Sequence, residues 1–229
     1  MNIRGKGSAV LLGGSGLVGG FCMKALLANP AYGRIVLLNR RELPVAPHPR
    51  MMQRIVNFEN LAVADFEGAD DIFCALGTTI RKAGTQEAFR RVDLEFPLAA
   101  ARRGLQAGTK QFVLVSSVGA DPASKTFYLH TKGELEQEVG KLGFRAAHIF
   151  RPSLLLGKRE EFRLGERAVT VIAPVFGVAM IGRLRKYRPI QAATVAKAMV
   201  AAASQEKSGT LIHEYDQIIQ LASAYADAG

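Results

Sequence analysis

The sequence contains no tryptophan and only two cysteines, Cys22 and Cys74. Small secreted domains that cannot build a large core rely on many disulfides, so this cysteine content excludes a disulfide-stapled scaffold. The two cysteines fall in a predicted helix and a predicted strand, where we expect them to be small core residues. We therefore expect a compartment that keeps thiols reduced, and a cytoplasmic protein.

Histidine is also scarce. The four histidines, His48, His130, His148 and His213, do not show the spacing of metal ligands. We expect these side chains to lie at the surface or in ordinary packing contacts, and we predict no metal site.

Long apolar segments are missing as well. The longest, residues 168–182, has 15 residues and contains Pro174, whereas a membrane-spanning helix needs about 20 apolar residues. Residues 1–7 are short and polar, unlike the start of a signal peptide. We expect no transmembrane segment and no secretory leader.

Basic residues outnumber acidic ones, with 30 Lys and Arg against 20 Asp and Glu and a formal net charge of +10. This charge attracts an anionic cofactor or substrate. A nucleic-acid surface also needs aromatic residues interleaved with basic ones on one face, and only residues 183–188 hint at that arrangement. The composition therefore argues against a nucleic-acid partner.

Near its start the chain contains an apolar run that leads directly into glycines. Gly13, Gly16 and Gly19 stand three residues apart, and an apolar-periodic segment follows through Leu27. Such glycines serve a turn that no side chain permits, close approach of the backbone to a phosphate, and close packing of helix on strand. The pattern predicts the strand–turn–helix of a dinucleotide site, with the pyrophosphate at the helix N-terminus.

Strand-like and helix-like segments alternate along the rest of the chain. We predict strands at residues 34–38, 54–57, 71–76, 111–115, 145–150 and 210–213, and helices at residues 60–66, 85–107, 127–142, 191–204 and 215–228. This alternation predicts an α/β Rossmann fold with a doubly wound, mostly parallel sheet. We interpret residues 1–229 as a single domain, with residues 157–190 as a small C-terminal substrate lobe.

Candidate site residues follow the ends of these predicted strands. In a parallel sheet, ligands bind beyond the carboxyl ends of the strands. Gly13, Arg40, Gly77, Ser117 and Pro152 all stand at such ends. We therefore expect one crevice to collect them.

Tyr128 and Lys132 form a Tyr-x-x-x-Lys pair on one face of a predicted helix. A phenol has a pKa of about 10, and a nearby ammonium, together with a positively charged nicotinamide, stabilises the phenolate. Ser117 can hydrogen-bond a carbonyl oxygen on which charge develops. We interpret these three as the catalytic residues of a hydride transfer, with Tyr128 giving or taking the proton.

Arg40 and Arg41 stand about 20 residues after Gly19, where an NAD-dependent enzyme usually carries an acidic residue for the ribose. An acid there repels a 2′-phosphate, whereas an arginine can clamp it with two hydrogen bonds. These residues predict NADP(H) as the cofactor.

Further motifs are spread over nearly the whole chain. They are the glycine stretch of residues 13–19, Asn-Arg-Arg at 39–41, Gly-Thr-Thr at 77–79, Arg-Val-Asp at 91–93, Ser-Ser-Val-Gly-Ala-Asp at 116–121, the segment 128–134 and Phe-Arg-Pro at 150–152. Together they resemble the atypical, extended short-chain dehydrogenase/reductase superfamily, and most of all its Tat-interacting-protein-like oxidoreductase branch.

The resemblance implies an NADPH-dependent oxidoreductase in which Tyr128 is the proton acceptor and Lys132 contacts the ribose. With the glycine pattern, it implies cofactor contacts at Gly13, Ser15, Gly16, Leu17, Val18, Gly19, Arg40, Arg41, Leu76, Gly77, Thr78, Tyr128 and Lys132, and downstream at Leu155 and Arg163. One departure is Asn57, where relatives often carry an acid near the adenine. Another is chain length, which is too short for the full substrate domain of sugar-nucleotide epimerases.

Several alternatives stay open at this point. The competing hypothesis is a regulator that senses NADPH and signals through a protein partner without turnover, since Lys132 can hold a ribose in either case. Asp93 is either a polar group beneath the site or part of a solvated helix face. Residues 168–182, followed by Arg183, Arg185 and Lys186, suit either a substrate wall with a cationic rim or a buried helix or homodimer contact.

Overall fold

A computed structural model describes residues 7–157 and 181–226. Its centre is a seven-stranded sheet in the order β3-β2-β1-β4-β5-β6-β9, and every neighbouring pair is parallel. The strands are β1 (Gly7–Leu12), β2 (Tyr32–Asn39), β3 (Met51–Ile55), β4 (Asp71–Cys74), β5 (Gln111–Val115), β6 (Ala146–Phe150) and β9 (Gly209–His213). The predicted α/β fold with a parallel sheet is confirmed.

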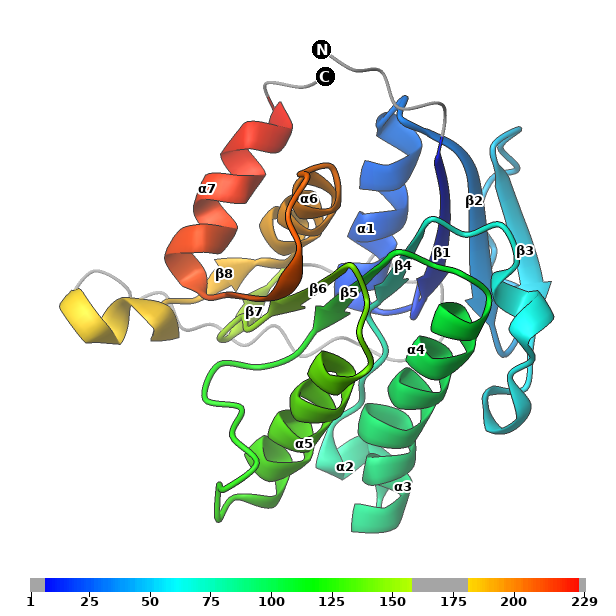
Figure 1. The fold of residues 1–229 in the computed structure, drawn as a ribbon. Helices are drawn as coiled ribbons and strands as arrows, with labels where there is room; N and C mark the ends of the chain where they lie inside the picture. Colours follow the sequence, from blue (N-terminus) through cyan, green and yellow to red (C-terminus); the bar gives the residue numbers. More distant parts are fainter. Residues whose placement is uncertain (1–6, 158–180, 227–229) are drawn as a thin grey trace.

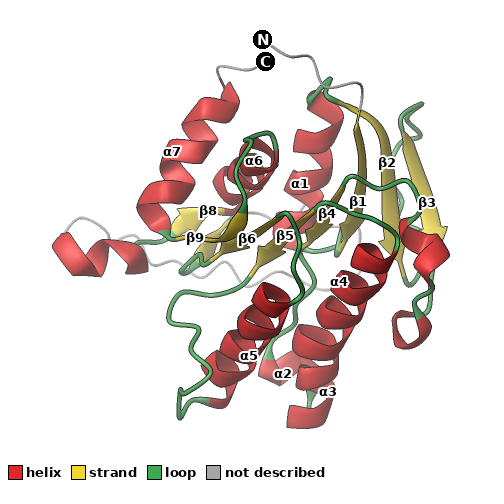
Figure 2. Ribbon diagram, in the orientation of Figure 1, coloured by secondary structure: helices red, strands yellow, loops and turns green. Residues whose placement is uncertain are grey.

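Helices cover both faces of the sheet (Figures 1 and 2). The helices on one face are α1 (Leu17–Ala28), α6 (Ala192–Ala203) and α7 (Tyr215–Ala226), and those on the other are α4 (Phe96–Gln106) and α5 (Phe127–Lys141). Two short helices, α2 (Ile80–Ala83) and α3 (Gln86–Arg90), precede α4 along the chain.

Strand β1 shows why this sequence forms a covered sheet. Successive side chains of a strand point to opposite faces. Leu11 accordingly joins the core beneath α1 and α6, while Leu12 joins the core beneath α4 and α5. Both side chains are fully buried, so the strand is a continuous apolar run, as is typical of a sheet with helices on both faces.

Two predicted elements differ in the structure. Strand β3 begins at Met51, three residues before the predicted strand at 54–57, and it is an edge strand that pairs only with β2. The residues of β3 are half-exposed, so they show only a weak apolar pattern. This weak pattern explains why the predicted start of the strand was three residues too late. The predicted helix at 60–66 is instead a pair of 3₁₀ turns, η1 (Phe58–Asn60) and η2 (Val63–Phe66).

The predicted helix over residues 85–107 is present but not continuous. A π-helical turn, η3 (Arg91–Glu95), separates α3 from α4. The wider turn changes which residues face the core, so Asp93 and Leu94 are buried while Val92 is only half-buried. An i→i+5 turn breaks the 3.6-residue periodicity of an α-helix, so the spacing of apolar residues does not predict which side chains of this segment are buried.

A second, two-stranded sheet pairs β7 (Leu155–Leu156) with β8 (Ile190–Gln191), and a 3₁₀ segment, η4 (Gly182–Tyr187), precedes β8. Most of the predicted substrate lobe, residues 158–180, lies outside the described residues, and the lobe stays a prediction. Within the described ranges, no helix has the length and apolar content to cross a bilayer.

Candidate active site

The glycine turn joins β1 to α1. Gly13 has a φ of +85°, and a Cβ built on it would lie 2.5 Å from the backbone of Ala75. A Cβ on Gly19 would collide with the Gly13 carbonyl oxygen, which also accepts a 2.8 Å hydrogen bond from the N–H of Gly16. A sharp turn and close helix packing therefore require glycine at 13 and 19.

The start of α1 offers free backbone donors. Gly16 is the N-cap and has no side chain to cap the helix, and the first turn contains no acidic residue. The N–H groups at a helix start carry partial positive charge, so this end of α1 suits a phosphate. Ser15 is exposed beside it, whereas the Val18 side chain is buried in the core and only its backbone can face a ligand.

Asp93 holds the loop after β4. Its Oδ2 accepts a 2.8 Å hydrogen bond from the Thr78 N–H, and its Oδ1 lies 2.7 Å from the Nζ of Lys132. A Cβ on Gly77 would lie 3.3 Å from that Asp93 oxygen. Asp93 is buried and paired with Lys132, so the interpretation of Asp93 as part of a solvated helix face is wrong. Its role beneath the site stays a prediction.

Lys132 is a buried cation, with its side chain 5% exposed. Burial lowers its pKa because the charged form loses hydration, but attraction to Asp93 and then to Tyr128 outweighs burial and leaves the pKa raised. The ammonium therefore persists at neutral pH. It lies one helical turn along α5 from Tyr128.

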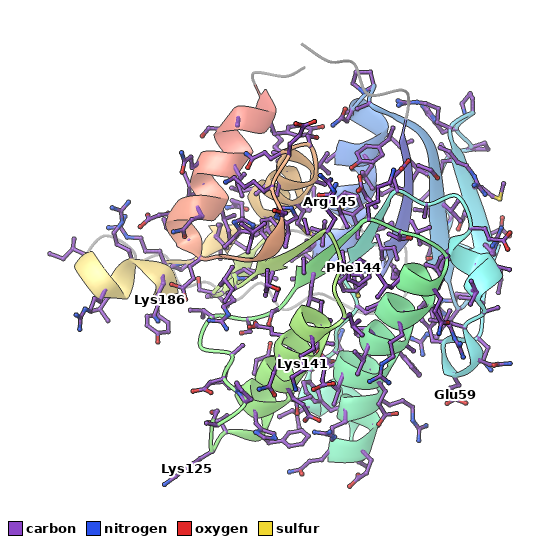
Figure 3. The ribbon with its side chains drawn as sticks, in the orientation of Figure 1. Glu59, Lys125, Lys141, Phe144, Arg145 and Lys186 are labelled. Atoms are coloured by element: carbon purple, nitrogen blue, oxygen red, sulfur yellow. The ribbon has the colours of Figure 1, made fainter. Side chains whose placement is uncertain are left out.

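Tyr128 lies in the first turn of α5 and is half-buried. Its ring packs against the Phe89 ring of α3, with 5.6 Å between ring centroids. Figure 3 marks Lys125 just before α5 and Lys141 at its last residue, so Tyr128 and Lys132 belong to the half of the helix nearer Lys125.

Ser117 follows β5, and its loop is tied to α5. The Asp121 N–H donates to the Leu129 carbonyl oxygen at 3.2 Å, and the Ala120 N–H donates to the Ser117 carbonyl oxygen at 3.1 Å. Among the described residues, the only hydrogen bond of the Ser117 hydroxyl is a long one of 3.4 Å to the Val118 carbonyl oxygen. A hydroxyl held so loosely can turn toward a substrate oxygen.

The sequence prediction missed a buried polar cluster next to these residues. Glu136 of α5 accepts a hydrogen bond from the Ser116 hydroxyl and pairs with Arg151, whose Nε lies 3.0 and 3.1 Å from its two carboxylate oxygens. The charge-assisted bond to Glu136 raises the pKa of Arg151. Glu136 stands four residues after Lys132, and this helical spacing is the signal that could have revealed it.

Arg40 and Arg41 are exposed directly after β2. The segment that follows them reaches the glycine turn, since a Cβ on Gly14 would lie 3.5 Å from the Leu43 side chain and 3.9 Å from the Asn39 side-chain oxygen. Asn39 and Leu43, the residues that flank the exposed loop, therefore lie beside the turn. That Arg40 and Arg41 contact the cofactor stays a prediction.

The downstream candidates are only partly described. Leu155 lies half-buried in β7, and β7 runs past the start of α1, because a Cβ on Gly157 would lie 3.4 Å from the Leu17 side chain. Arg163 lies outside the described residues. The suggested cationic rim is partly neutralised, with Arg185 2.9 Å from Asp216 and Lys186, which Figure 3 labels on η4, 3.9 Å from Glu214.

Both cysteines and two of the four histidines are buried in the core. Cys22 and Cys74 are buried and unpaired, and burial raises the pKa of the Cys74 thiol to about 12, so they are core residues as expected. His148 and His213 stack in the core with 3.0 Å between ring nitrogens. No three histidine, cysteine or acidic side chains gather as metal ligands in the described ranges.

The fold is similar to solved structures. MoeE5 in complex with UDP-glucose and NAD superposes with a TM-score of 0.68 over 96% of this chain and 82% of that one, at 15% sequence identity. At such low identity the likeness shows the fold alone, and it agrees with the predicted Rossmann architecture.

Sequence relatives are more informative. The protein HTATIP2 of Rattus norvegicus is 40% identical over 163 residues, which cover 69% of this chain and 67% of the relative. The protein FMP52, mitochondrial, of Candida albicans is 32% identical over 229 residues and covers 95% of this chain and 99% of the relative. No family model matches the chain.

These relatives correct one expectation. A cytoplasmic setting was expected from the sequence, but the fungal relatives are named as mitochondrial proteins, so that expectation is wrong. It rested on two cysteines without a disulfide framework, and unpaired thiols do not single out the cytoplasm. Identity above 30% over most of the chain establishes that this protein belongs to the family of HTATIP2 and FMP52, the Tat-interacting-protein-like branch of the extended short-chain dehydrogenases/reductases.

Proposed function

We propose that this protein is an NADP(H)-dependent oxidoreductase that moves a hydride between the nicotinamide and a carbonyl or hydroxyl group of a small molecule. The observation that carries the proposal is the buried Lys132–Asp93 pair, one helical turn from Tyr128 and bordered by Gly77. A cation held permanently beside a phenol stabilises the phenolate that a proton-transferring tyrosine forms.

The residues present fit a dinucleotide. The turn at Gly13 and Gly19 leaves no room for a Cβ, and the uncapped start of α1 directs N–H groups at the same place. MoeE5, which shares the fold, was solved with NAD. Arg40 and Arg41 support a 2′-phosphate on the ribose, and therefore NADP(H) rather than NAD(H).

The chain's own residues would divide the chemistry as follows, with bound NADPH supplying the hydride. Tyr128 would give its proton to the substrate carbonyl oxygen as negative charge develops there. Ser117 donates a hydrogen bond to the same oxygen while charge develops on it. Lys132 offsets the charge left on Tyr128, and Asp93 keeps Lys132 in place.

The test is NADPH oxidation, followed at the nicotinamide absorbance across a panel of aldehydes and ketones. Tyr128→Phe is compared with the wild type and with Tyr187→Phe, which alters an exposed tyrosine of η4. We expect Tyr128→Phe to lower turnover about 10²–10⁴-fold and to leave NADPH binding intact, with no change in the control. A loss of only a few-fold would contradict the role of Tyr128, and tight NADPH binding without turnover of any carbonyl would favour the sensor.

A further inference from the structure

Gln53 lies on β3 and makes three hydrogen bonds, one to the last residue of β2 and two to the segment that follows it. Its Oε1 accepts from the Asn39 side-chain amide at 3.1 Å and from the Leu43 N–H at 2.8 Å. Its Nε2 donates to the Leu43 carbonyl oxygen at 2.9 Å. One amide therefore binds residues on both sides of a three-residue loop, residues 40–42.

That loop carries the two arginines. Arg40 and Arg41 are exposed, while the residues that bracket them, Asn39 and Leu43, are buried. The Gln53 side chain thus bridges the two ends of the loop, and the arginine side chains remain in solvent.

The hydrogen bonds of Gln53 also hold the loop in place relative to the glycine turn. Leu43, which Gln53 holds through its backbone, lies against Gly14, at 3.5 Å from the position of an added Cβ. Asn39 lies against the same glycine at 3.9 Å. Loss of the Gln53 hydrogen bonds would loosen the loop that contains Arg40 and Arg41, and it would leave the residues of the glycine turn unchanged.

We infer that Gln53 is a positioning residue for cofactor specificity, which pre-forms the Arg40–Arg41 loop so that the site selects a dinucleotide with a 2′-phosphate. The inference rests on the proposed NADP(H)-dependent function. Gln53 does not touch the cofactor in this scheme and acts through the arginines.

The physical reason is entropic. A loop that is ordered before the ligand arrives does not lose its backbone freedom on binding. That advantage applies only to a ligand whose phosphate the loop holds. NADH lacks the 2′-phosphate, so its affinity should be nearly independent of Gln53.

The experiment measures dissociation constants of NADPH and NADH for the wild type, Gln53→Met and Met52→Ala. Methionine keeps the length of the side chain and removes all three hydrogen bonds, and Met52 is the half-exposed neighbour on the same strand. We expect Gln53→Met to weaken NADPH about five- to ten-fold and NADH less than about two-fold, with Met52→Ala unchanged. In an Arg40→Ala/Arg41→Ala background, Gln53→Met should have no further effect on NADPH.

Trypsin supplies a readout that needs no ligand, because it cleaves after Arg40 and Arg41. Faster cleavage there in Gln53→Met than in the wild type is expected, and Gln53→Asn replaces it in both assays if the methionine variant does not fold. A wild type that binds both cofactors equally would overturn the NADP(H) assignment and this inference with it. A wild-type preference that survives loss of the Gln53 hydrogen bonds would overturn the inference alone.

Discussion

The carboxylate of Asp93 lies 2.7 Å from the ammonium of Lys132, and both side chains are almost entirely excluded from solvent. Asp93→Asn keeps an oxygen for the Thr78 N–H but leaves Lys132 without its counter-charge. We expect the free energy of unfolding to fall by about 3 kcal/mol, because an unpaired charge remains buried, and turnover to fall with it. Urea denaturation and steady-state rates measure the two effects.

The matched control for this prediction is Glu59→Gln. Glu59, which Figure 3 labels, pairs with Arg91 at 3.5 Å with both side chains more than half exposed, so its loss should leave stability nearly unchanged. The pKa of Lys132 in the folded protein is raised above its ordinary 10.5. In the wild type, the stabilisation that charged Lys132 gives the folded state is therefore complete below about pH 10.5. It is lost as the pH rises through the raised pKa. Equal stabilities of Asp93→Asn and wild type at neutral pH would contradict this account.

Arg40 and Arg41 together should decide between the two nicotinamide cofactors. We expect Arg40→Ala/Arg41→Ala to weaken NADPH binding about ten-fold or more, since hydrogen bonds to charged groups are the stronger ones, and to leave NADH binding unchanged. Arg102→Ala/Arg103→Ala removes a second exposed arginine pair, on α4, and controls for net charge. The prediction fails if both double variants change NADPH affinity equally.

Two glycines of α5 should respond in opposite ways to alanine. A Cβ on Gly133 would collide with the backbone of Asp121 and Pro122, whereas one on Gly140 would meet only the Thr210 side chain, at 3.4 Å. We expect Gly133→Ala to destabilise the protein and reduce turnover, because it displaces the loop after Ser117. Gly140→Ala should be neutral or stabilising by up to about 1 kcal/mol, the helix propensity gained. Thermal melting distinguishes the effects of the two substitutions. An unchanged melting temperature for Gly133→Ala would contradict the prediction, because it would show that the loop after Ser117 moves aside at little cost.

His148 and His213 should make the protein sensitive to acid. Burial is the main cause that lowers the pKa of each to about 4 from the ordinary 6.5. A folded-state pKa below the unfolded one means that stability is complete above about pH 6.5 and is lost as the pH falls toward 4. We expect His148→Phe/His213→Phe to show a smaller drop in melting temperature between about pH 7.5 and pH 5 than the wild type. His130→Gln, at a half-exposed position, should retain the wild-type drop.

Much of the fold could be predicted because buried parallel strands such as β1 are continuous apolar runs that end in glycine. The Tyr128–Lys132 spacing was equally visible, since it lies within one helix. Asp93 could not be assigned, because a π-turn changed the face it presents. Gln53 was missed for a different reason: its partners, Asn39 and Leu43, are brought to it only by strand pairing, and single-sequence periodicity carries no information about such pairs.

The position of β1 in the sheet has a consequence for how the chain acquires its structure. β1 is the first strand along the chain, yet it lies in the interior, between β2 and β4. Its pairing with β4 joins Ala9 to Asp71, so one edge of an apolar strand stays unpaired until the polypeptide through Cys74 has been synthesised. Folding is slow when strands that are distant in sequence must pair, and until they pair the unpaired strand edges stay exposed. Nascent chains shorter than this should therefore depend on chaperones, and fragments ending before β4 should aggregate.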